Sequence, residues 1–247
     1  MSLAEEYQRQ YQWRPWPQIY AALPPLRHLT ILDLGCAIGD QAADLSARGV
    51  HVIGVDANEE LVTAARSRVD GQFIVGDLRK IAVDVEADGI WSSFTAAYFP
   101  HDFVDVLRTW RSQLKPNGWI AVTEVDDLFG HEPVSERTRS LLGDFADDAL
   151  RAGRYDSRMG RKLPAYLEDA GFSVNATFKC EESELSFGGA AEPDVIDAWR
   201  ARFARMPRLR DLCGEEFDAV RDDFLTCLSR NDHRSLASVF CTIASTT

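Results

Sequence analysis

The sequence predicts an α/β protein in which helices cover both faces of a mainly parallel, doubly wound sheet. Short apolar runs alternate with amphipathic stretches through the first half of the chain, which is the pattern of repeated strand–helix units. The expected strands are joined through helices rather than tight hairpins, and this connectivity makes them parallel. The chain has 247 residues, of which 45% are hydrophobic, enough for one domain with a sizeable core.

The first half contains five expected strands and three expected helices. The strands are the apolar runs Leu29–Leu34, Val50–Val55, Gln72–Val75, Asp88–Ser93 and Trp119–Val125. The helices are the amphipathic stretches Gln41–Ala47, Glu60–Arg68 and Phe103–Leu114. Lys115-Pro116-Asn117-Gly118 is predicted to be a turn, because proline and glycine end the preceding helix and reverse the chain.

The second half is predicted to be mostly helical. Helices are expected at Pro133–Arg151 and Arg161–Ala170, and strands at Phe172–Cys180 and Ser235–Ser245. The residues between these two strands have helical periodicity around Val195–Arg205 and Glu215–Leu228, which predicts a helical insertion near the C-terminus.

The composition limits which binding partners and which cellular compartment are expected. The net charge of −12 repels phosphate backbones, so no nucleic acid partner is expected. The one basic cluster is interpreted as a solvated helix face: Arg151, Arg154, Arg158, Arg161 and Lys162. No apolar run approaches the ~20 residues that span a membrane, and the N-terminus does not suit a signal peptide. The five cysteines include no CxxC pair, so we expect no metal site, no disulfide framework and a reducing, cytoplasmic setting.

The most informative segment is the loop after the first strand, Asp33-Leu34-Gly35-Cys36-Ala37-Ile38-Gly39-Asp40. A buried strand runs into a glycine-containing turn that opens a helix. Gly35 and Gly39 have no Cβ atom, so the backbone there can pass close to a ligand. In open α/β sheets the ligand lies beyond the carboxyl ends of the strands. A turn of this kind also occurs without a ligand.

Two further acids favour a ligand site. Asp56 ends the second strand, where a carboxylate can accept hydrogen bonds from both hydroxyls of a ribose. Asp77 follows the third strand, where a carboxylate can accept from the exocyclic amine of an adenine. One such acid is more often a loop cap, but Asp33, Asp56 and Asp77 at three successive strand ends predict an adenosine pocket.

These residues carry a family resemblance. The loop from Asp33 to Gly39, with Asp56, Asp77 and Leu114-Lys115-Pro116-Asn117-Gly118-Trp119, resembles class I S-adenosylmethionine-dependent methyltransferases of the small-molecule type. The resemblance covers roughly residues 29–125 by motif. It implies S-adenosylmethionine as the cofactor and a seven-stranded sheet whose last strand is antiparallel. Ala37 departs from the family, which usually has glycine there; its methyl group is tolerable but can shift the loop and weaken cofactor binding.

The resemblance implies a role for each motif residue. Asp33 orders the loop and reaches towards the amino group of the cofactor. The remaining residues are expected to follow the cofactor along its length: Gly35, Cys36 and Gly39 at the methionine, Ser93 and Phe94 at the sulfonium and carboxylate, Asp56 and Ala57 at the ribose and adenine, and Asp77 and Leu78 at the adenine edge.

A nicotinamide dinucleotide is the alternative cofactor. Its fingerprint Gly-x-Gly-x-x-Gly would begin at Gly35, but Ala37 and Asp40 occupy the second and third glycine positions. Asp40 would also oppose a pyrophosphate at the positive end of the following helix. A sulfonium cofactor has no phosphate, so these residues favour S-adenosylmethionine.

The reaction needs few catalytic groups. Methyl transfer is a direct displacement in which the protein mainly holds the acceptor in line, and a base is needed only if the acceptor arrives protonated. Tyr98 and His101 are the candidate bases, with core packing and helix capping as their alternative roles. Glu124 and Asp126, at the end of the fifth strand, either bind an amine substrate, act as a base or are solvated loop carboxylates. His131 is expected to be exposed.

Aromatic residues mark the N-terminal segment. Tyr7 and Tyr11, like Trp16 and Tyr20, are four residues apart and share a helix face. The segment is either a helix packed on the sheet or a lid in which Arg14 pairs with the cofactor carboxylate. One domain, 1–247, is therefore expected to contain an N-terminal helical lid (1–28), a cofactor-binding half (29–125), a helical connection (126–170) and a helical insertion (181–234).

The sequence thus predicts an S-adenosylmethionine-dependent methyltransferase that acts on a small-molecule acceptor by direct displacement. A non-catalytic S-adenosylmethionine-binding protein and a nicotinamide-dependent oxidoreductase are the alternatives. Oxygen, nitrogen, carbon and sulfur all remain open as the accepting atom.

Overall fold

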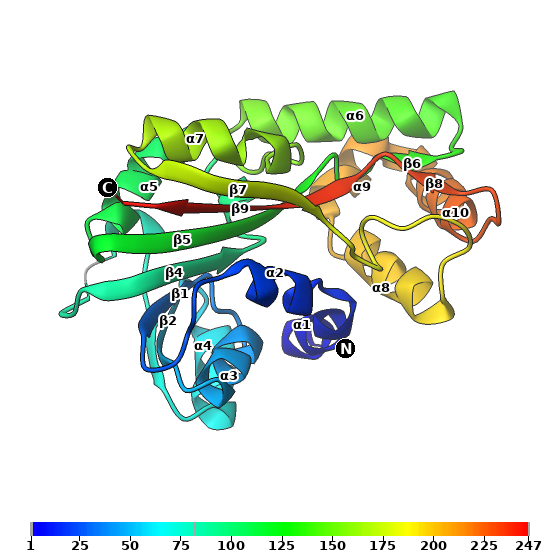
Figure 1. The fold of residues 1–247 in the computed structure, drawn as a ribbon. Helices are drawn as coiled ribbons and strands as arrows, with labels where there is room; N and C mark the ends of the chain where they lie inside the picture. The colour runs from blue at the N-terminus through cyan, green and yellow to red at the C-terminus, as the bar shows by residue number, and fades with distance from the viewer. Residues whose placement is uncertain (1, 82, 247) are drawn as a thin grey trace.

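The computed structural model describes residues 2–81 and 83–246, which fold around one seven-stranded sheet (Figure 1). The strand order is β3, β2, β1, β4, β5, β9, β7. The strands span Thr30–Leu34 (β1), His51–Asp56 (β2), Gln72–Val75 (β3), Ala87–Ser93 (β4), Leu114–Asp126 (β5), Ser173–Cys180 (β7) and Ser238–Ser245 (β9). The pairs from β3 to β5 are parallel, whereas β9 is antiparallel to both β5 and β7. The predicted α/β class, the seven strands and the antiparallel last strand are confirmed.

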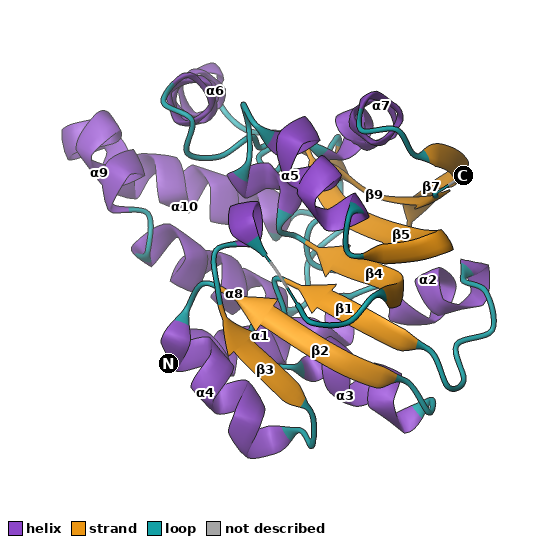
Figure 2. Cartoon of the chain, turned by 90° about the vertical axis from the view of Figure 1, so that its left-hand side faces the viewer, coloured by secondary structure: helices purple, strands orange, loops and turns teal. Residues whose placement is uncertain are grey.

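Helices cover both faces of the sheet (Figure 2). Successive strand residues face opposite sides, so β1 contributes to two separate buried clusters. Ile31 belongs to the cluster that contains residues of α2 (Trp16–Ala22), α3 (Asp40–Ala47) and α4 (Glu59–Arg68). Leu32 and Leu34 belong to the cluster that contains residues of α5 (Phe103–Arg111) and α7 (Leu163–Asp169). The sheet is therefore doubly wound, and the carboxyl ends of β1 to β4 meet at one edge.

The chain between β7 and β9 forms a helical layer, on the right in Figure 1. Its helices are α8 (Pro193–Ala204), α9 (Pro207–Cys213) and α10 (Phe217–Leu228), which pack with α6 (Glu136–Arg151). Trp199 and Phe224 are fully buried, with ring centroids 4.9 Å apart. The sequence did not predict α9 or the paired two-residue strands β6 (His131–Glu132) and β8 (Arg234–Ser235).

The N-terminal segment divides into two parts with different surroundings. α2 packs on the sheet, where Trp16 and Ile19 are buried and the Trp16 ring lies 5.7 Å from that of Trp91. α1 (Leu3–Gln10) begins at a capping box formed by Ser2 and Glu5. Ion pairs of Arg9 with Asp194 and of Glu6 with Arg205 join α1 to the helical layer. The interpretation as a helix packed on the sheet therefore applies to α2, and the lid stays a prediction.

Two local predictions differ from the structure. The helix expected to reach Leu114 ends at Arg111, and Lys115–Gly118 is not a separate turn but an irregular part of β5. Its pairing with β4 jumps from Leu114 opposite Ala87 to Trp119 opposite Gly89, and Asn117 takes a left-handed φ of 61°. These four residues bulge out of the ladder between β4 and β5, and regular pairing begins again at Trp119.

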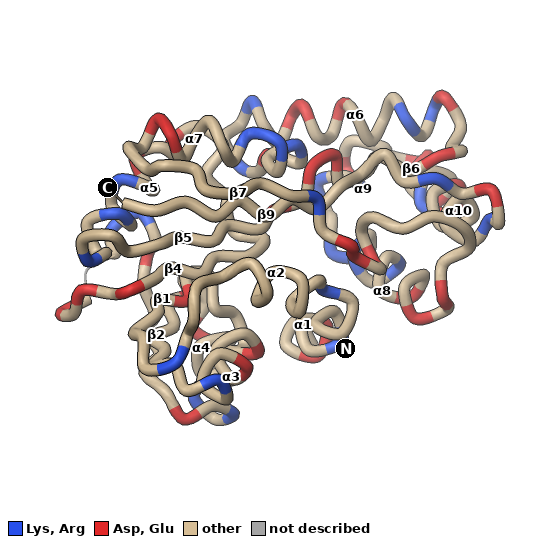
Figure 3. The backbone as a smooth tube through the Cα atoms, in the orientation of Figure 1, with Lys and Arg blue, Asp and Glu red and all other residues tan. Residues whose placement is uncertain are grey.

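The basic cluster is paired rather than simply solvated. Basic and acidic residues lie side by side along α6 and the loop after it (Figure 3). Each of four cluster members forms an ion pair with an aspartate: Arg154 with Asp148, Arg158 with Asp147, Arg161 with Asp126, and Lys162 with Asp156. None of the described helices is long and apolar enough to cross a membrane.

Candidate active site

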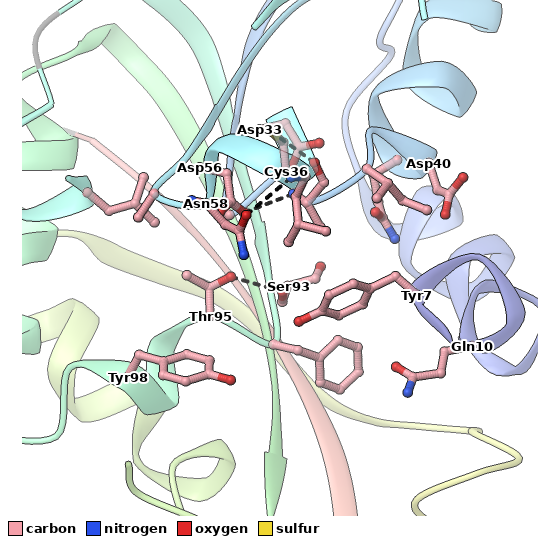
Figure 4. A pocket seen from close by; sticks show the side chains of 18 of the residues that line it. Tyr7, Gln10, Asp33, Cys36, Asp40, Asp56, Asn58, Ser93, Thr95 and Tyr98 are labelled. Carbon is pink, nitrogen blue, oxygen red and sulfur yellow. Dashed lines mark hydrogen bonds between the residues drawn. The ribbon is translucent and has the colours of Figure 1, made fainter. Parts of the chain in front are cut away.

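A cavity of about 750 Å³ opens at the carboxyl ends of the strands (Figure 4). The sheet side contributes residues that follow β1, β2, β3 and β4, and the N-terminal segment closes the other side. Every residue predicted to contact the cofactor lines this cavity except Gly39: Arg14, Asp33, Gly35, Cys36, Asp56, Ala57, Asp77, Leu78, Ser93 and Phe94. Strand-end residues as far apart as Asp33 and Phe94 are thus brought to one wall, because parallel strands end at the same edge.

The glycine loop is fixed by backbone hydrogen bonds. The N–H groups of Gly35 and Cys36 donate to the carbonyl of Val55 at 2.8 and 3.2 Å, and Gly39 donates to the carbonyl of Cys36 at 2.8 Å. Gly35 has φ +84°, and a Cβ atom there would lie 2.1 Å from Thr95 Oγ1. Gly39, with φ +80°, would place a Cβ 3.2 Å from Ala65 and faces α4 rather than the cavity. Gly35 therefore shapes the cavity wall, whereas Gly39 serves helix packing.

Ala37 adopts a left-handed conformation with φ 45°. Its N–H donates to Asp56 Oδ2 at 2.9 Å. This bond holds the residue in a conformation that glycine would adopt without a Cβ penalty. The departure from the family pattern is thus accommodated, with the loop tied to the end of β2.

Asp56 connects three loops. Besides Ala37, it accepts the N–H of Asn58 at Oδ1, at 2.9 Å, and its carbonyl accepts the N–H of Gly76 at 2.9 Å. Each carboxylate oxygen has a second acceptor site, so both remain able to accept from a ribose. Asp77 plays a similar part after β3, where its Oδ1 accepts the N–H of Arg79 at 3.0 Å.

Asp33 is the polar group that most clearly needs a ligand. It is 2% exposed, and its Oδ2 has no hydrogen-bond partner in the described structure. Burial, with the nearby charge of Asp56, raises the pKa of Asp33 to about 8. A buried carboxylate oxygen without a partner is costly, and the ammonium group of S-adenosylmethionine would satisfy it. The carboxylate acceptors of this wall therefore fit the hydrogen-bond donors of this cofactor.

Comparison with known proteins agrees with the geometry. A family model described as "Methyltransferase domain" matches residues 31–118. A trans-aconitate 2-methyltransferase of Mycobacterium tuberculosis (strain ATCC 25177 / H37Ra) is 30% identical over 230 residues, which are 87% of this chain and 82% of the relative. The chain belongs to the class I S-adenosylmethionine-dependent methyltransferases. The predicted cofactor is S-adenosylmethionine, and the nicotinamide alternative is set aside.

Other relatives agree with this methyltransferase family. A trans-aconitate 2-methyltransferase of Mycolicibacterium gilvum is 33% identical over 179 residues, which are 67% of this chain and 66% of the relative. The chain thus spans just under two thirds of that protein. A methyltransferase solved in complex with the Haloferax volcanii Trm112 activator has the same fold, with a TM-score of 0.61 at 16% identity over 98% of this chain and 94% of that one.

The two candidate bases lie in different places in this methyltransferase. Tyr98 lines the cavity, and Figure 4 shows its hydroxyl and that of Tyr7 directed towards the middle of the cavity from opposite sides. Although the Tyr98 side chain opens into the cavity, burial by the surrounding wall and the nearby Tyr7 and Glu124 raise its pKa to about 12. His101 is exposed, outside the cavity lining and beside Gly153. The structure therefore does not bring His101 to the site.

The acids after the fifth strand are buried, not solvated. Glu124 is 0% exposed and accepts the N–H groups of Ala97 and Val125 at 3.1 and 2.9 Å. Burial raises the pKa of Glu124 to about 7. Because Ala97 precedes Tyr98, Glu124 supports the 3₁₀ turn that carries the tyrosine. Asp126 accepts from Arg161 Nε at 2.6 Å and is also buried.

The prediction that His131 is exposed is wrong. His131 is 2% exposed, and its Nδ1 lies 2.9 Å from Nε2 of His233 between β6 and β8. Burial and the neighbouring His233 lower the pKa of His131 to about 3. The ring is therefore neutral and packs among the aromatic residues of the helical layer.

Arg14 lies at the cavity wall but already has partners. Its guanidinium pairs with Glu182, lies 2.8 Å from Glu184 Oε2 and donates to Gln10 Oε1 at 3.0 Å. It also lies 4.6 Å from the ring centre of Phe94. The pairing of Arg14 with the cofactor carboxylate stays a prediction.

Several wall residues were missed by the sequence interpretation. Leu3 and Gln10 line the cavity from the same face of the N-terminal segment as Tyr7 and Arg14, which the lid hypothesis already named. Their spacing of four, three and four residues is the signal that could have identified them together. Glu182 and Glu184 follow β7 and pair with Arg14 outside the described lining, and no sequence signal of this kind links them to it.

Proposed function

We propose that this methyltransferase transfers a methyl group to a carboxylate oxygen of a small-molecule acceptor, forming a methyl ester. When bound, S-adenosylmethionine supplies an electrophilic methyl group whose bond to sulfur breaks, with its electron pair leaving on sulfur, as the bond to the acceptor oxygen forms. The observation that carries the proposal is the lack of a suitable base in the described cavity wall.

The wall residues near the acceptor end cannot take a proton at neutral pH. The described lining contains no histidine or glutamate, and its aspartates belong to the cofactor end. Burial raises the pKa of both Tyr7 and Tyr98, so their hydroxyls donate hydrogen bonds rather than act as bases. A carboxyl group, with an ordinary pKa of about 4, arrives already ionised and needs no base.

Hydrogen-bond donors face the space where the acceptor would lie. Tyr7 and Tyr98 offer their hydroxyls, and Gln10 uses its oxygen to accept from Arg14, which leaves its amide N–H groups free to donate. Donors of this kind suit the oxygens of a carboxylate. They hold the acceptor in place, and positioning is the main protein contribution to a displacement of this type.

The relatives and the cavity support an acceptor of small size. Two similar proteins are named trans-aconitate 2-methyltransferase, and trans-aconitate is a small carboxylic acid. A cavity of about 750 Å³ has room for the cofactor and a compact acceptor. All five cysteines are free and buried, which supports a reducing compartment, the cytoplasm.

The test is to incubate the protein with S-adenosylmethionine and small carboxylic acids, beginning with trans-aconitate, and to measure S-adenosylhomocysteine. The methylated product, identified by mass, should return to the free acid in mild alkali, as methyl esters do. A product stable to alkali would place the methyl group on another kind of atom. Cofactor binding without turnover of any acid would instead support the non-catalytic alternative.

A further inference from the structure

A buried cluster of two arginines and two glutamates lies next to the cavity, which it lines through Arg14. Arg14 pairs with Glu182 and Glu184, and Arg202 Nη2 lies 2.6 Å from Glu184 Oε1. The side chains are 7% (Arg14), 16% (Arg202) and 0% (both glutamates) exposed. Glu182 also accepts the N–H of Glu184 at 2.8 Å, which fixes its position. The two positive charges of this cluster are therefore neutralised by its own carboxylates.

The rest of the described wall adds more negative than positive charge. It holds four aspartates, Asp33, Asp40, Asp56 and Asp77, and one further arginine, Arg79. Arg79 Nε lies 2.6 Å from Asp102 Oδ2, so it too has a carboxylate partner. Asp40 is likewise paired with Arg68, at 2.7 Å. Without these two pairs, the lining and the cluster contain five acidic side chains (Asp33, Asp56, Asp77, Glu182 and Glu184) against the guanidiniums of Arg14 and Arg202, and bound S-adenosylmethionine adds one net positive charge.

The acceptor end of the cavity is otherwise aromatic and apolar. Phe94 and Phe99 line it together with Tyr7, Tyr98 and Leu3. These side chains provide apolar surface and no charge. A carboxylate placed against them, away from water and without a cation, would be strongly disfavoured.

We propose that the acceptor carries a single carboxylate on an otherwise uncharged, apolar body, and that Glu184 enforces this limit by neutralising both Arg14 and Arg202. The inference rests on the proposed transfer to a carboxylate. One carboxylate is accommodated by the hydroxyls of Tyr7 and Tyr98 and the amide of Gln10. Second and third carboxylates would meet arginines that are already paired with glutamates and a wall of net negative charge. A tricarboxylate needs cations that can pair with it, and these residues do not supply them.

The test compares two compounds with one carbon skeleton. Trans-aconitate has three carboxylates, and its dimethyl ester has one. Binding of each to the protein saturated with S-adenosylhomocysteine is measured by calorimetry, and turnover with S-adenosylmethionine is measured in parallel. We expect the dimethyl ester to bind at least tenfold more tightly and to be methylated with the higher kcat/KM. Equal or tighter binding of the tricarboxylate would overturn the inference.

The variant Glu184→Gln isolates the role of the cluster. It removes one carboxylate of the cluster, so the affinity for trans-aconitate should rise severalfold while that for the dimethyl ester changes less than twofold. Glu181→Gln is the matched control, because Glu181 is exposed and lies outside the cluster. An equal gain in both variants would show that only overall charge matters and would contradict the assignment to Glu184.

Ionic strength gives a second measurement on the unaltered protein. Salt screens charge over about 10 Å at 0.1 M, so trans-aconitate binding should tighten between low salt and about 0.2 M, whereas dimethyl ester binding should not. Weakening of trans-aconitate binding by salt would show a positively charged site and overturn the inference. If neither compound binds or is methylated, the proposed carboxylate acceptor itself is wrong. Methylation with a preference for the tricarboxylate would remove only the charge limit.

Discussion

The N–H of Ala37 donates to the Asp56 carboxylate at 2.9 Å, so the acid predicted to hold a ribose also holds the loop that follows β1. Ala37 has φ 45°, a conformation that costs a non-glycine residue roughly 1–2 kcal/mol. The hydrogen bond stabilises that conformation. The predicted ribose contact and the loop geometry therefore depend on the same side chain.

This shared dependence makes Asp56 the most sensitive cofactor residue. Asp56→Ala should weaken S-adenosylmethionine binding at least roughly tenfold, about 1.4 kcal/mol, because the ribose contact and the loop tether are lost together. Asp56→Asn keeps one carbonyl oxygen and should lose less. Calorimetry measures both, with the exposed Asp70→Ala as control. An unchanged dissociation constant for Asp56→Ala would show that the ribose lies elsewhere.

Gly35→Ala should destabilise the protein and abolish tight cofactor binding. The new Cβ would lie 2.1 Å from Thr95 Oγ1 and the residue would keep φ near +84°, a combination that costs about 1–3 kcal/mol. Thermal unfolding should show a Tm lower by several degrees. Gly143→Ala is the control, since Gly143 lies in α6 with nothing within 4 Å of an added Cβ, and it should stabilise the helix. Equal effects at both positions would contradict the role given to Gly35.

The stability of the cofactor-free protein should depend on the charge of Asp33. Its folded pKa of about 8 lies above the unfolded value of about 4, so the folded state holds a proton that the unfolded state loses. Stability therefore falls as pH rises from about 4 to 8. Denaturant unfolding of Asp33→Asn should lack this contribution, and the contribution of Glu124 cancels because both proteins contain it. Parallel pH profiles for the two proteins would argue against a protonated Asp33.

Tyr98→Phe should impair use of the acceptor without affecting the cofactor. Loss of one hydrogen bond of about 0.5–1.5 kcal/mol predicts a roughly three- to tenfold drop in kcat/KM for the acceptor. The affinity for S-adenosylmethionine should change less than twofold. Tyr166→Phe is the control, because Tyr166 packs on Phe103 away from the cavity. A loss of more than a thousandfold would instead indicate that Tyr98 removes a proton.

The cofactor half of the site was predictable because its residues are local to strand ends. Asp33, Asp56 and Asp77 each follow a buried strand, and parallel pairing alone brings strand ends together. The parallel sheet was predictable for a similar reason, because each buried strand is an apolar run in the sequence and a helix separates it from the next. The antiparallel last strand came from the family resemblance rather than from periodicity.

Apart from Tyr98, the proposed acceptor half was not predictable, because its residues meet only through tertiary packing. Glu182 and Glu184 follow β7, some 170 residues from Arg14, and no sequence spacing links them. His131 was expected at the surface because it was placed on the loop after the fifth strand, but pairing of β6 with β8 places it against His233. His101 follows the same strand as Tyr98, yet Tyr98 ends the 3₁₀ turn Ala96–Tyr98 and lies in the cavity, whereas His101, three residues later, is exposed.

The position of β9 has a consequence for how the chain is made. β9 pairs with β5 on one side and β7 on the other, so β7 has no neighbour in the sheet until residues 238–245 have been translated. A ribosome-bound chain that has just produced β7 thus presents an unsatisfied strand edge, next to a half-sheet that is otherwise able to assemble. Synthesis of the intervening helices delays closure, and during that interval the nascent protein is most exposed to aggregation.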